Sequence, residues 1–262
     1  MRTGTVIVTG CTGGLGQATC RLLAAQGFDI IGQYRSREDA AMALQEDVAR
    51  VGGRASMVCA DLADPAGVDR LVSEVEDILS QPGTSSLMGL VNNAAKLLGP
   101  AFGSATARQF DDFMSLNIRA PFFLAQQLST LMCAGGSIVN VSSVATRFSS
   151  PGDIVYAMSK AALEALTYHA AEVLAEKGVR INTVMPGFTD NGHPAFGEPR
   201  MREFMSSFAA LGGVAQPEEI AASICFLISD ASSRTTGSIL DASGGSALGR
   251  RPAEGSISNL LD

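Results

Sequence analysis

One segment near the start of the chain sets its architecture: Thr5-Val6-Ile7-Val8-Thr9-Gly10-Cys11-Thr12-Gly13-Gly14-Leu15-Gly16. Its first five residues are β-branched, which is typical of a strand buried on both faces of a sheet. Glycines then permit a tight turn, and a helical pattern begins at Gly14. The free N–H groups at the start of a helix attract phosphate. The segment, with Gly10, Gly14 and Gly16 spaced as T-G-x-x-x-G-x-G, therefore predicts a strand–turn–helix unit that holds a nucleotide pyrophosphate.

The rest of the chain repeats this unit of strand followed by helix. Further strands are predicted at residues 29–33, 55–59, 87–92, 137–142, 180–185 and 238–241. Helices are predicted at residues 14–26, 37–51, 65–80, 107–132, 154–177 and 217–229. The pattern over 107–132 predicts two helices, or one helix bent near Pro121. Such alternation predicts an α/β fold of the Rossmann-like, doubly wound kind, with a parallel sheet flanked by helices.

The chain shows no proline-, glycine- or serine-rich linker in its middle, so residues 1–249 are predicted to form a single domain. Residues 188–213 interrupt the rhythm with glycines, prolines and phenylalanines. This stretch predicts an insertion with one or two short helices, either a lid over a substrate or an ordinary surface excursion. Residues 250–262 are predicted to be a poorly ordered C-terminal tail.

The composition argues against several classes of protein. With 19 Lys and Arg against 26 Asp and Glu, the net charge of −7 disfavours nucleic acid as a partner. The apolar runs fall short of the roughly 18–20 residues of a membrane span. The start of the chain has no secretory pattern, and the five scattered cysteines form no C-x-x-C pair. We therefore expect a cytoplasmic protein without a metal site, a membrane partner or a nucleic-acid partner.

The end of the second predicted strand bears on the choice of dinucleotide. Proteins that prefer NAD place an acidic residue there to bind the ribose 2′-hydroxyl. This chain instead has Gln33-Tyr34-Arg35-Ser36-Arg37, in which the Arg35 guanidinium and the Ser36 hydroxyl suit a 2′-phosphate. The alternative is that the arginines only begin a solvated helix, although the missing acid disfavours NAD even then. The sequence predicts NADP(H) over NAD(H).

Two of the few tyrosines and lysines stand four residues apart in a predicted helix, Tyr156 and Lys160. Residues at this spacing share one helix face, and an ammonium beside a phenol lowers the phenol's pKa. That arrangement suits acid–base chemistry near neutral pH, although a buried tyrosine beside a surface lysine would look the same. Ser143 follows the fifth predicted strand, and Asn117 lies in the helix after the fourth. The carboxyl ends of the strands in a parallel sheet face the ligand crevice, so Ser143 is expected to lie there.

Taken together, these motifs resemble those of the short-chain dehydrogenase/reductase family, in its main branch. The resemblance runs from Thr5 to about Ala247. It rests on Thr9-Gly10-x-x-x-Gly14-x-Gly16, Asp61-Leu62, Asn92-Asn93-Ala94, Asn117, Ser143, Tyr156-x-x-x-Lys160 and Asn182-x-Val184-x-Pro186-Gly187. It implies a seven-stranded sheet in the order 3-2-1-4-5-6-7. It also implies a homodimer or homotetramer formed through helices 107–132 and 154–177.

The resemblance also implies a role for each motif residue. Tyr156 exchanges a proton with the substrate oxygen, which Ser143 holds. Lys160 binds the nicotinamide ribose and lowers the pKa of Tyr156, and Asn117 fixes a water in a proton relay. The residues implied to bind the cofactor are Gly10, Thr12, Gly14, Leu15, Gly16, Tyr34, Arg35, Ser36, Asp61, Leu62, Asn92, Ala94, Tyr156, Lys160, Pro186, Gly187 and Thr189.

Some positions depart from the family pattern. Ala95 stands where the family usually has glycine, and Gly13 stands where NADP-dependent members often carry a basic residue. A threonine that usually bonds the nicotinamide carboxamide is replaced by Asn191, so either Asn191 or Thr189 serves there.

The expected function is that of an NADPH-dependent ketoreductase. The segments expected to line the substrate site are mostly apolar, which favours a 3-oxoacyl or polyketide-like carbonyl, although Lys96 or Arg147 could meet an anionic group. One alternative is an NAD-dependent alcohol dehydrogenase of the same family. An enoyl reductase is disfavoured by the four-residue tyrosine–lysine spacing. A nucleotide-binding regulator without catalysis is disfavoured because the catalytic motif residues are all present.

Overall fold

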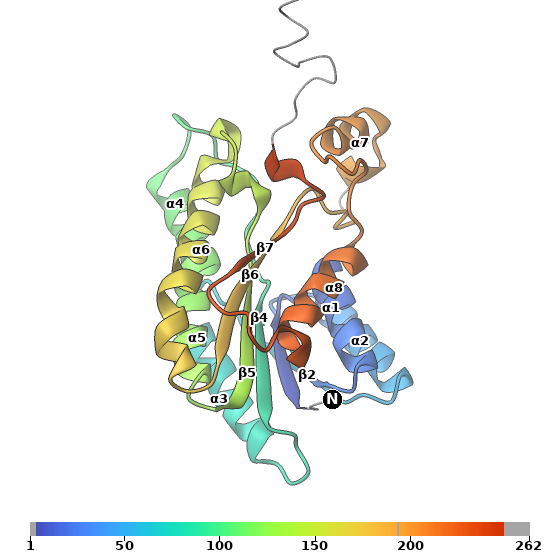
Figure 1. Ribbon diagram of the computed structural model, residues 1–262, viewed down its shortest axis with the longest axis vertical. Coiled ribbons are helices and arrows are strands. Elements are labelled where there is room, and N and C mark those ends of the chain that lie inside the picture. The colour runs from blue at the N-terminus through green and yellow to red at the C-terminus, as the bar shows by residue number, and fades with distance from the viewer. Residues whose placement is uncertain (1–3, 193, 249–262) are drawn as a thin grey trace, which may run out of the picture.

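The computed structural model describes residues 4–192 and 194–248 (Figure 1). Seven parallel strands form one sheet in the order β3-β2-β1-β4-β5-β6-β7, which confirms the predicted fold class and strand order. The strands are β1 (Thr5–Thr9), β2 (Asp29–Tyr34), β3 (Ala55–Cys59), β4 (Leu87–Asn92), β5 (Met132–Val141), β6 (Arg180–Pro186) and β7 (Ile239–Ala242). The tail predicted at residues 250–262 lies outside the described residues.

Helices cover both faces of the sheet, with α1, α2 and α8 on one face and α3, α4, α5 and α6 on the other (Figure 1). Their bounds are α1 (Gly14–Ala25), α2 (Glu38–Arg50), α3 (Pro65–Ser80), α4 (Ala107–Met114), α5 (Ala120–Leu128), α6 (Ile154–Ala175), α7 (Pro199–Ser206) and α8 (Pro217–Ile228). Within the described ranges, no helix is both long enough and apolar enough to cross a lipid bilayer.

The hydrophobic core is divided into two by the sheet. Val6 of β1 belongs to the cluster that contains Leu23 of α1 and Ile224 of α8. Its neighbour Ile7 belongs to the opposite cluster, with Leu71 of α3. Successive side chains of a strand point to opposite faces, so a strand covered on both sides must be apolar at every position. The uninterrupted β-branched run of β1 has this cause.

The helix predicted at residues 107–132 is interrupted and ends early. Between α4 and α5 the backbone makes a π-helical turn, Ser115–Arg119, which ends two residues before Pro121. Proline has no N–H to donate to the carbonyl four residues earlier, which accounts for a disturbed ladder here. The prediction was wrong beyond Leu128, because Met132 pairs with Leu87 of β4 and so begins β5. This pairing joins residues that are far apart in the sequence, so the helical periodicity of residues 107–132 could not predict it.

The insertion at residues 188–213 contains a 3-10 helix, Pro194–Gly197, followed by α7, which stands beyond the carboxyl ends of the strands (Figure 1). A cluster of rings joins it to the rest of the molecule. The Phe208 ring lies 5.7 Å from that of Phe148, 5.4 Å from that of Phe188 and 5.1 Å from that of Phe204. Because Phe148 follows the strand end that carries Ser143, the insertion packs beside the predicted catalytic edge.

The glycine turn between β1 and α1 allows a test of how tightly the fold is packed. A Cβ atom added at Gly16 would lie 2.3 Å from the Gly10 carbonyl oxygen, whereas one added at Gly13 would lie 3.5 Å from the same atom. We expect Gly16→Ala to lower the free energy of unfolding by about 1–3 kcal/mol, the usual effect of overpacking. Gly13→Ala is the control and should lose at most about 1 kcal/mol. Chemical denaturation measures both, and equal losses would contradict the packing argument.

Candidate active site

The structure brings three of the predicted catalytic residues together at the carboxyl edge of the sheet. Ser143 follows β5, and Tyr156 and Lys160 lie one turn apart on α6. The Ser143 hydroxyl lies near the phenol of Tyr156 and acts to lower the pKa of that phenol. The Lys160 Nζ atom lies 5.9 Å from the centroid of the Tyr156 ring. The strand end therefore supplies a hydroxyl, and one helix face supplies a phenol and an ammonium.

Burial governs the acidity of Tyr156 in this structure. Desolvation raises the pKa of Tyr156 above its ordinary value, the Ser143 hydroxyl lowers it, and the nearby Asp153 carboxylate raises it further. The direction is opposite to the lowering expected from Lys160, because the loss of water from around the phenolate is the largest influence on this pKa. At neutral pH the phenol therefore keeps its proton and can donate it to a substrate oxygen.

Lys160 is itself buried beneath the phenol. Its Nζ atom donates a hydrogen bond of 2.7 Å to the Val141 carbonyl oxygen at the end of β5. Desolvation lowers the pKa of Lys160 from 10.5 to about 8. A buried ammonium with one carbonyl partner has further donors to offer a ligand. The position thus fits the predicted contact with ribose hydroxyls.

Asn117 lies next to this group and is held by other residues. Its Oδ1 atom accepts from the Lys96 backbone N–H at 2.8 Å. Its Nδ2 group donates to the Lys96 carbonyl at 3.0 Å and to the Ser159 hydroxyl at 2.9 Å. These contacts tie the π-helical turn to α6 one residue before Lys160. The predicted water relay through Asn117 stays a prediction.

The glycine turn has the features that a pyrophosphate needs. Gly13 caps α1 with no side-chain hydrogen bond, and the first turn of α1 has no acidic residue, so its N–H groups face outward without a side-chain competitor. The side chain of Gln33 holds the backbone of this turn in place. Its Oε1 atom accepts from the Gly10 N–H at 2.9 Å, and its Nε2 group donates to the Ala60 carbonyl at 2.7 Å. The residues present therefore fit the predicted cofactor at this turn.

The other predicted residues of the turn lie along its rim. The Thr12 carbonyl accepts from the guanidinium of Arg37 and from the side chain of Gln17. Leu15 is partly exposed in the first turn of α1. A Cβ atom added at Gly14 would lie 3.4 Å from the Asn191 Cα atom, so the start of the insertion passes directly over the helix start. Both Asn191 and the turn would therefore border a bound dinucleotide.

The end of β2 presents Arg35 and Ser36 to solvent, whereas the Tyr34 ring is buried. The Tyr34 carbonyl accepts from the Ala60 N–H, so this residue supports the strand end rather than offering its side chain. The Arg35 guanidinium has no ion-pair partner within residues 4–192 and 194–248. An unpaired guanidinium at this place can bind a phosphate in the bidentate manner of arginine.

Of the residues predicted to border the adenosine, one is exposed and the others are buried or directed into the fold. Asp61 is exposed, and Leu62 is buried just behind it. The Asn92 side chain is directed into the fold, where its Nδ2 group donates to Asn140 Oδ1 at 2.8 Å. Asn92 would therefore reach a ribose only through its backbone. The Ala94 N–H donates to the Thr9 hydroxyl at 3.0 Å and thereby fixes the end of β4 against β1.

The segment predicted to line the nicotinamide is packed against β7. Pro186 is buried at the end of β6, and a Cβ atom added at Gly187 would lie 2.8 Å from the Ser243 carbonyl oxygen. Thr189 donates to the Gly187 carbonyl at 3.2 Å and forms an isolated parallel bridge with Ala215. Only glycine fits at position 187, which explains the Pro-Gly motif by packing.

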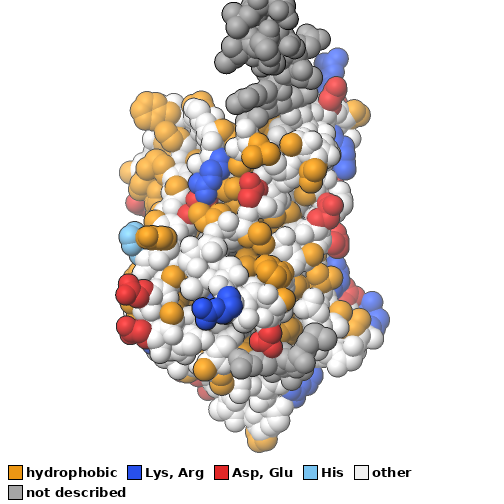
Figure 2. Space-filling view, in the orientation of Figure 1, with side chains coloured by type: hydrophobic (Ala, Val, Ile, Leu, Met, Phe, Trp, Pro, Cys, Tyr) orange, Lys and Arg blue, Asp and Glu red, His pale blue; other side chains and the backbone are white. Residues whose placement is uncertain are grey.

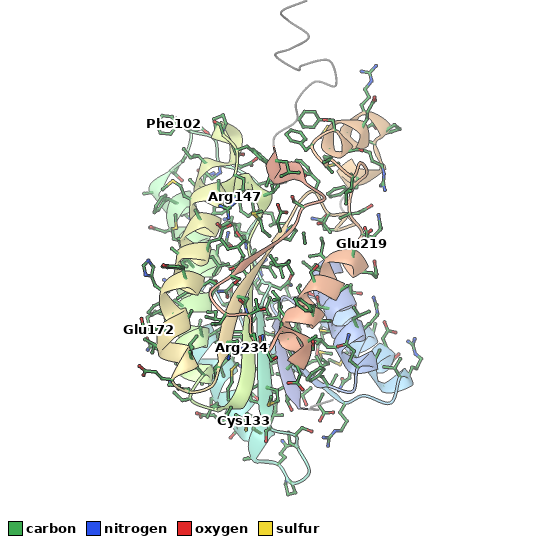
Figure 3. All side chains as sticks on the ribbon, viewed as in Figure 1. Phe102, Cys133, Arg147, Glu172, Glu219 and Arg234 are labelled. Atoms are coloured by element: carbon green, nitrogen blue, oxygen red, sulfur yellow. The ribbon has the colours of Figure 1, made fainter. Side chains whose placement is uncertain are left out.

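Two basic side chains near the site, those of Lys96 and Arg147, form ion pairs. The Lys96 ammonium lies 2.8 Å from Asp112, and the Arg147 guanidinium lies 2.8 Å from Glu164. The expectation that Lys96 or Arg147 meets an anionic group of the substrate is therefore weakened. Figure 3 places Arg147 beside the upper part of α6.

The sequence analysis did not predict the supporting roles of Gln33 and Glu164. Gln33 could have been noticed as a polar residue in an otherwise apolar strand, and Glu164 as an acid four residues after Lys160.

Known proteins resemble this chain over nearly its whole length. A family model described as Enoyl-(Acyl carrier protein) reductase matches residues 10–247. The chain belongs to the short-chain dehydrogenase/reductase family. The predicted membership is thereby confirmed, and the chain is an oxidoreductase of this family.

Among the short-chain dehydrogenases/reductases, the chain is similar to the uncharacterized oxidoreductase YgfF of Escherichia coli, with 35% identity over 91% of this chain and 98% of that protein. It is similar to the 3-oxoacyl-[acyl-carrier-protein] reductase of Synechocystis, with 32% identity over 92% of this chain and 96% of that protein. The solved structure of the angucycline C-6 ketoreductase LanV with bound NADP superposes with a TM-score of 0.90, at 38% identity, over 95% of this chain and 99% of that chain.

Proposed function

We propose that this oxidoreductase is an NADPH-dependent ketoreductase that acts on a ketone carried by an apolar body, such as a 3-oxoacyl thioester or a polyketide-like ketone. The observation that carries the proposal is the meeting of Ser143, at the end of β5, with Tyr156 and the buried Lys160, whose Nζ atom lies 5.9 Å from the centroid of the Tyr156 ring. The bound nicotinamide supplies hydride. Ser143 and Tyr156 hold the carbonyl oxygen, and the phenol gives it a proton as charge develops there.

Apolar side chains near the site support an apolar substrate. Figure 2 shows hydrophobic side chains gathered at the carboxyl edge of the molecule and over α8. The exposed ones near the edge include Leu98 and Phe102 in the loop after β4, and Phe204 and Leu211 in the insertion. We propose that residues 188–213 act as the lid over this substrate. LanV, which is similar along nearly its whole length, is a ketoreductase of an angucycline, and the Synechocystis relative is a 3-oxoacyl reductase.

The reaction is tested by following NADPH oxidation with three substrates, a 3-oxoacyl thioester, a polycyclic aromatic ketone and an enoyl thioester. The proposal expects reduction of at least one ketone and little or no reduction of the enoyl double bond. Preferential reduction of the enoyl thioester would instead favour the activity after which the matching family model is described. Alcohol oxidation with NAD and no ketone reduction would favour the alcohol dehydrogenase alternative.

Cofactor preference is predicted to depend on Arg35. Arg35→Ala should weaken NADPH binding by about 10- to 100-fold, the effect of losing a charge-assisted contact of about 1.5–3 kcal/mol, and leave NADH binding nearly unchanged. Only NADPH carries the 2′-phosphate that the unpaired guanidinium would meet. Titration of nicotinamide fluorescence measures both affinities. Arg50→Ala, which removes an exposed arginine at the other end of α2, is the control. An equal loss for both cofactors would remove Arg35 from this role.

We further propose that copies of the chain assemble as a homodimer or homotetramer in the cytoplasm. The outer faces of the helices on one side of the sheet expose Phe122 and Phe123 on α5 and Tyr168 and Val173 on α6. Burial of such apolar side chains drives association. Light scattering on the purified protein measures its mass, and a monomer would contradict the assembly. The five cysteines are all free, which suits a reducing compartment.

A further inference from the structure

A buried carboxylate lies on the catalytic face of α6. Glu164 follows Lys160 by four residues and Tyr156 by eight, so the three side chains lie on one side of the helix. The Glu164 side chain is only 8% exposed. Isolated carboxylates are costly to bury, so its partners account for its presence.

Three residues satisfy this carboxylate, and all of them come from the segment around Ser143. The Oε1 atom accepts from the Ser142 hydroxyl at 2.7 Å and from the Thr146 hydroxyl at 2.9 Å. The Oε2 atom lies 2.8 Å from an Arg147 guanidinium nitrogen. Hydrogen bonds to a charged group are stronger than those between neutral groups. One carboxylate therefore binds residues on both sides of Ser143.

The position of these contacts matters because Ser143 stands at a change of backbone direction. It is the last extended residue before the 3-10 helix Val144–Thr146, and its own hydroxyl accepts from the Ala145 N–H at 3.2 Å. Apart from Glu164, α6 holds this region through the Lys160 Nζ bond to the Val141 carbonyl at 2.7 Å and the longer contact of Ser142 with the Lys160 carbonyl at 3.4 Å. Both lie before Ser143, so Glu164 is the residue of α6 that holds Thr146 and Arg147 on its other side. The distance between the serine hydroxyl and the phenol thus depends on how the turn is anchored to the helix.

We propose that Glu164 is a positioning residue, which anchors the Ser143 turn to α6 and so sets Ser143 relative to Tyr156 and Lys160. The consequence for catalysis rests on the proposed ketoreductase function; the anchoring itself does not. The ion pair with Arg147, whose side chain is 34% exposed, gives little net stability, so orientation of the turn is its main effect.

Hydrogen exchange tests the anchoring without any substrate. In Glu164→Ala, the backbone amides of residues 144–147 should exchange at least tenfold faster than in the wild type, while those of residues 138–141 in β5 keep their rates. Glu172→Ala, an exposed glutamate two turns further along α6, should change neither set. Glu164→Gln keeps an oxygen acceptor for the two hydroxyls and should restore most of the protection. Unchanged exchange at residues 144–147 in both Glu164 variants would overturn the proposal.

A double-mutant cycle tests the catalytic consequence. Glu164→Ala should lower kcat for ketone reduction by about 10- to 100-fold, the scale of a small misplacement, with the NADPH affinity unchanged. In a Ser143→Ala background the same change should lower kcat less than about twofold, because the group being positioned is already absent. An equal loss in both backgrounds would show a general structural role and overturn the positioning. If the wild type reduces no ketone, the proposed function fails, and hydrogen exchange still decides whether the anchoring exists.

Discussion

Turnover of ketone substrates is expected to fall by about 10²-fold or more when Tyr156 is replaced by phenylalanine, the scale of lost acid catalysis. In the proposed reaction, this phenol donates the proton to a substrate oxygen that Ser143 holds. Because burial raises the pKa of Tyr156, the wild-type phenol is protonated at neutral pH, which is the form that reduction requires. Phenylalanine keeps the ring that lies edge-on to Phe113, with centroids 6.5 Å apart, so the packing is preserved.

Steady-state kinetics with saturating NADPH measure this effect, and titration of nicotinamide fluorescence should show cofactor affinity within about twofold of the wild type. Tyr168→Phe is the matched control, because Tyr168 lies on the same helix but is 71% exposed to solvent. It should turn over like the wild type. Retained turnover in Tyr156→Phe would remove this phenol from the chemistry.

Replacing Lys160 by methionine is expected to abolish most activity and to change how stability depends on pH. The buried ammonium, which donates to the Val141 carbonyl, is predicted to bind the nicotinamide ribose as well, so its loss should weaken NADPH binding and lower turnover by about 10²-fold. Lys177→Met, at an exposed lysine just beyond α6, is the control and should have neither effect. Full activity in Lys160→Met would contradict the assignment of this residue to the site.

The direction of the pH effect follows from the pKa of Lys160, which burial lowers from 10.5 to about 8. Below about pH 8 the lysine is charged in both states, and the folded protein bears the full penalty of a buried ammonium. Between about pH 8 and 10.5 the unfolded chain binds more protons than the folded one, so stability rises with pH. Relative to Lys160→Met, the wild type should therefore gain on the order of 3 kcal/mol across this window. Urea unfolding at several pH values measures the difference, and a fall would contradict the sign.

Local sequence patterns were enough to predict the architecture. The β-branched run of β1, the glycines after it and the repeated alternation of strand and helix are features of neighbouring residues, and the covered sheet follows from them. The pairing of Tyr156 with Lys160 also follows from helical spacing alone, and Ser143 from its place at a strand end. Residues along one element or at one edge of a parallel sheet meet for reasons that a linear pattern contains.

Contacts between distant segments decided the rest. Met132 begins a strand because Leu87 lies beside it, the Asn92 side chain is withdrawn from the ligand edge by Asn140, and the pKa of Tyr156 rises because its surroundings exclude water. The partners of Glu164 likewise come from another element. Hydrogen-bond pairing and desolvation depend on all the groups packed around a side chain. The periodicity of residues along the chain cannot predict which groups those are.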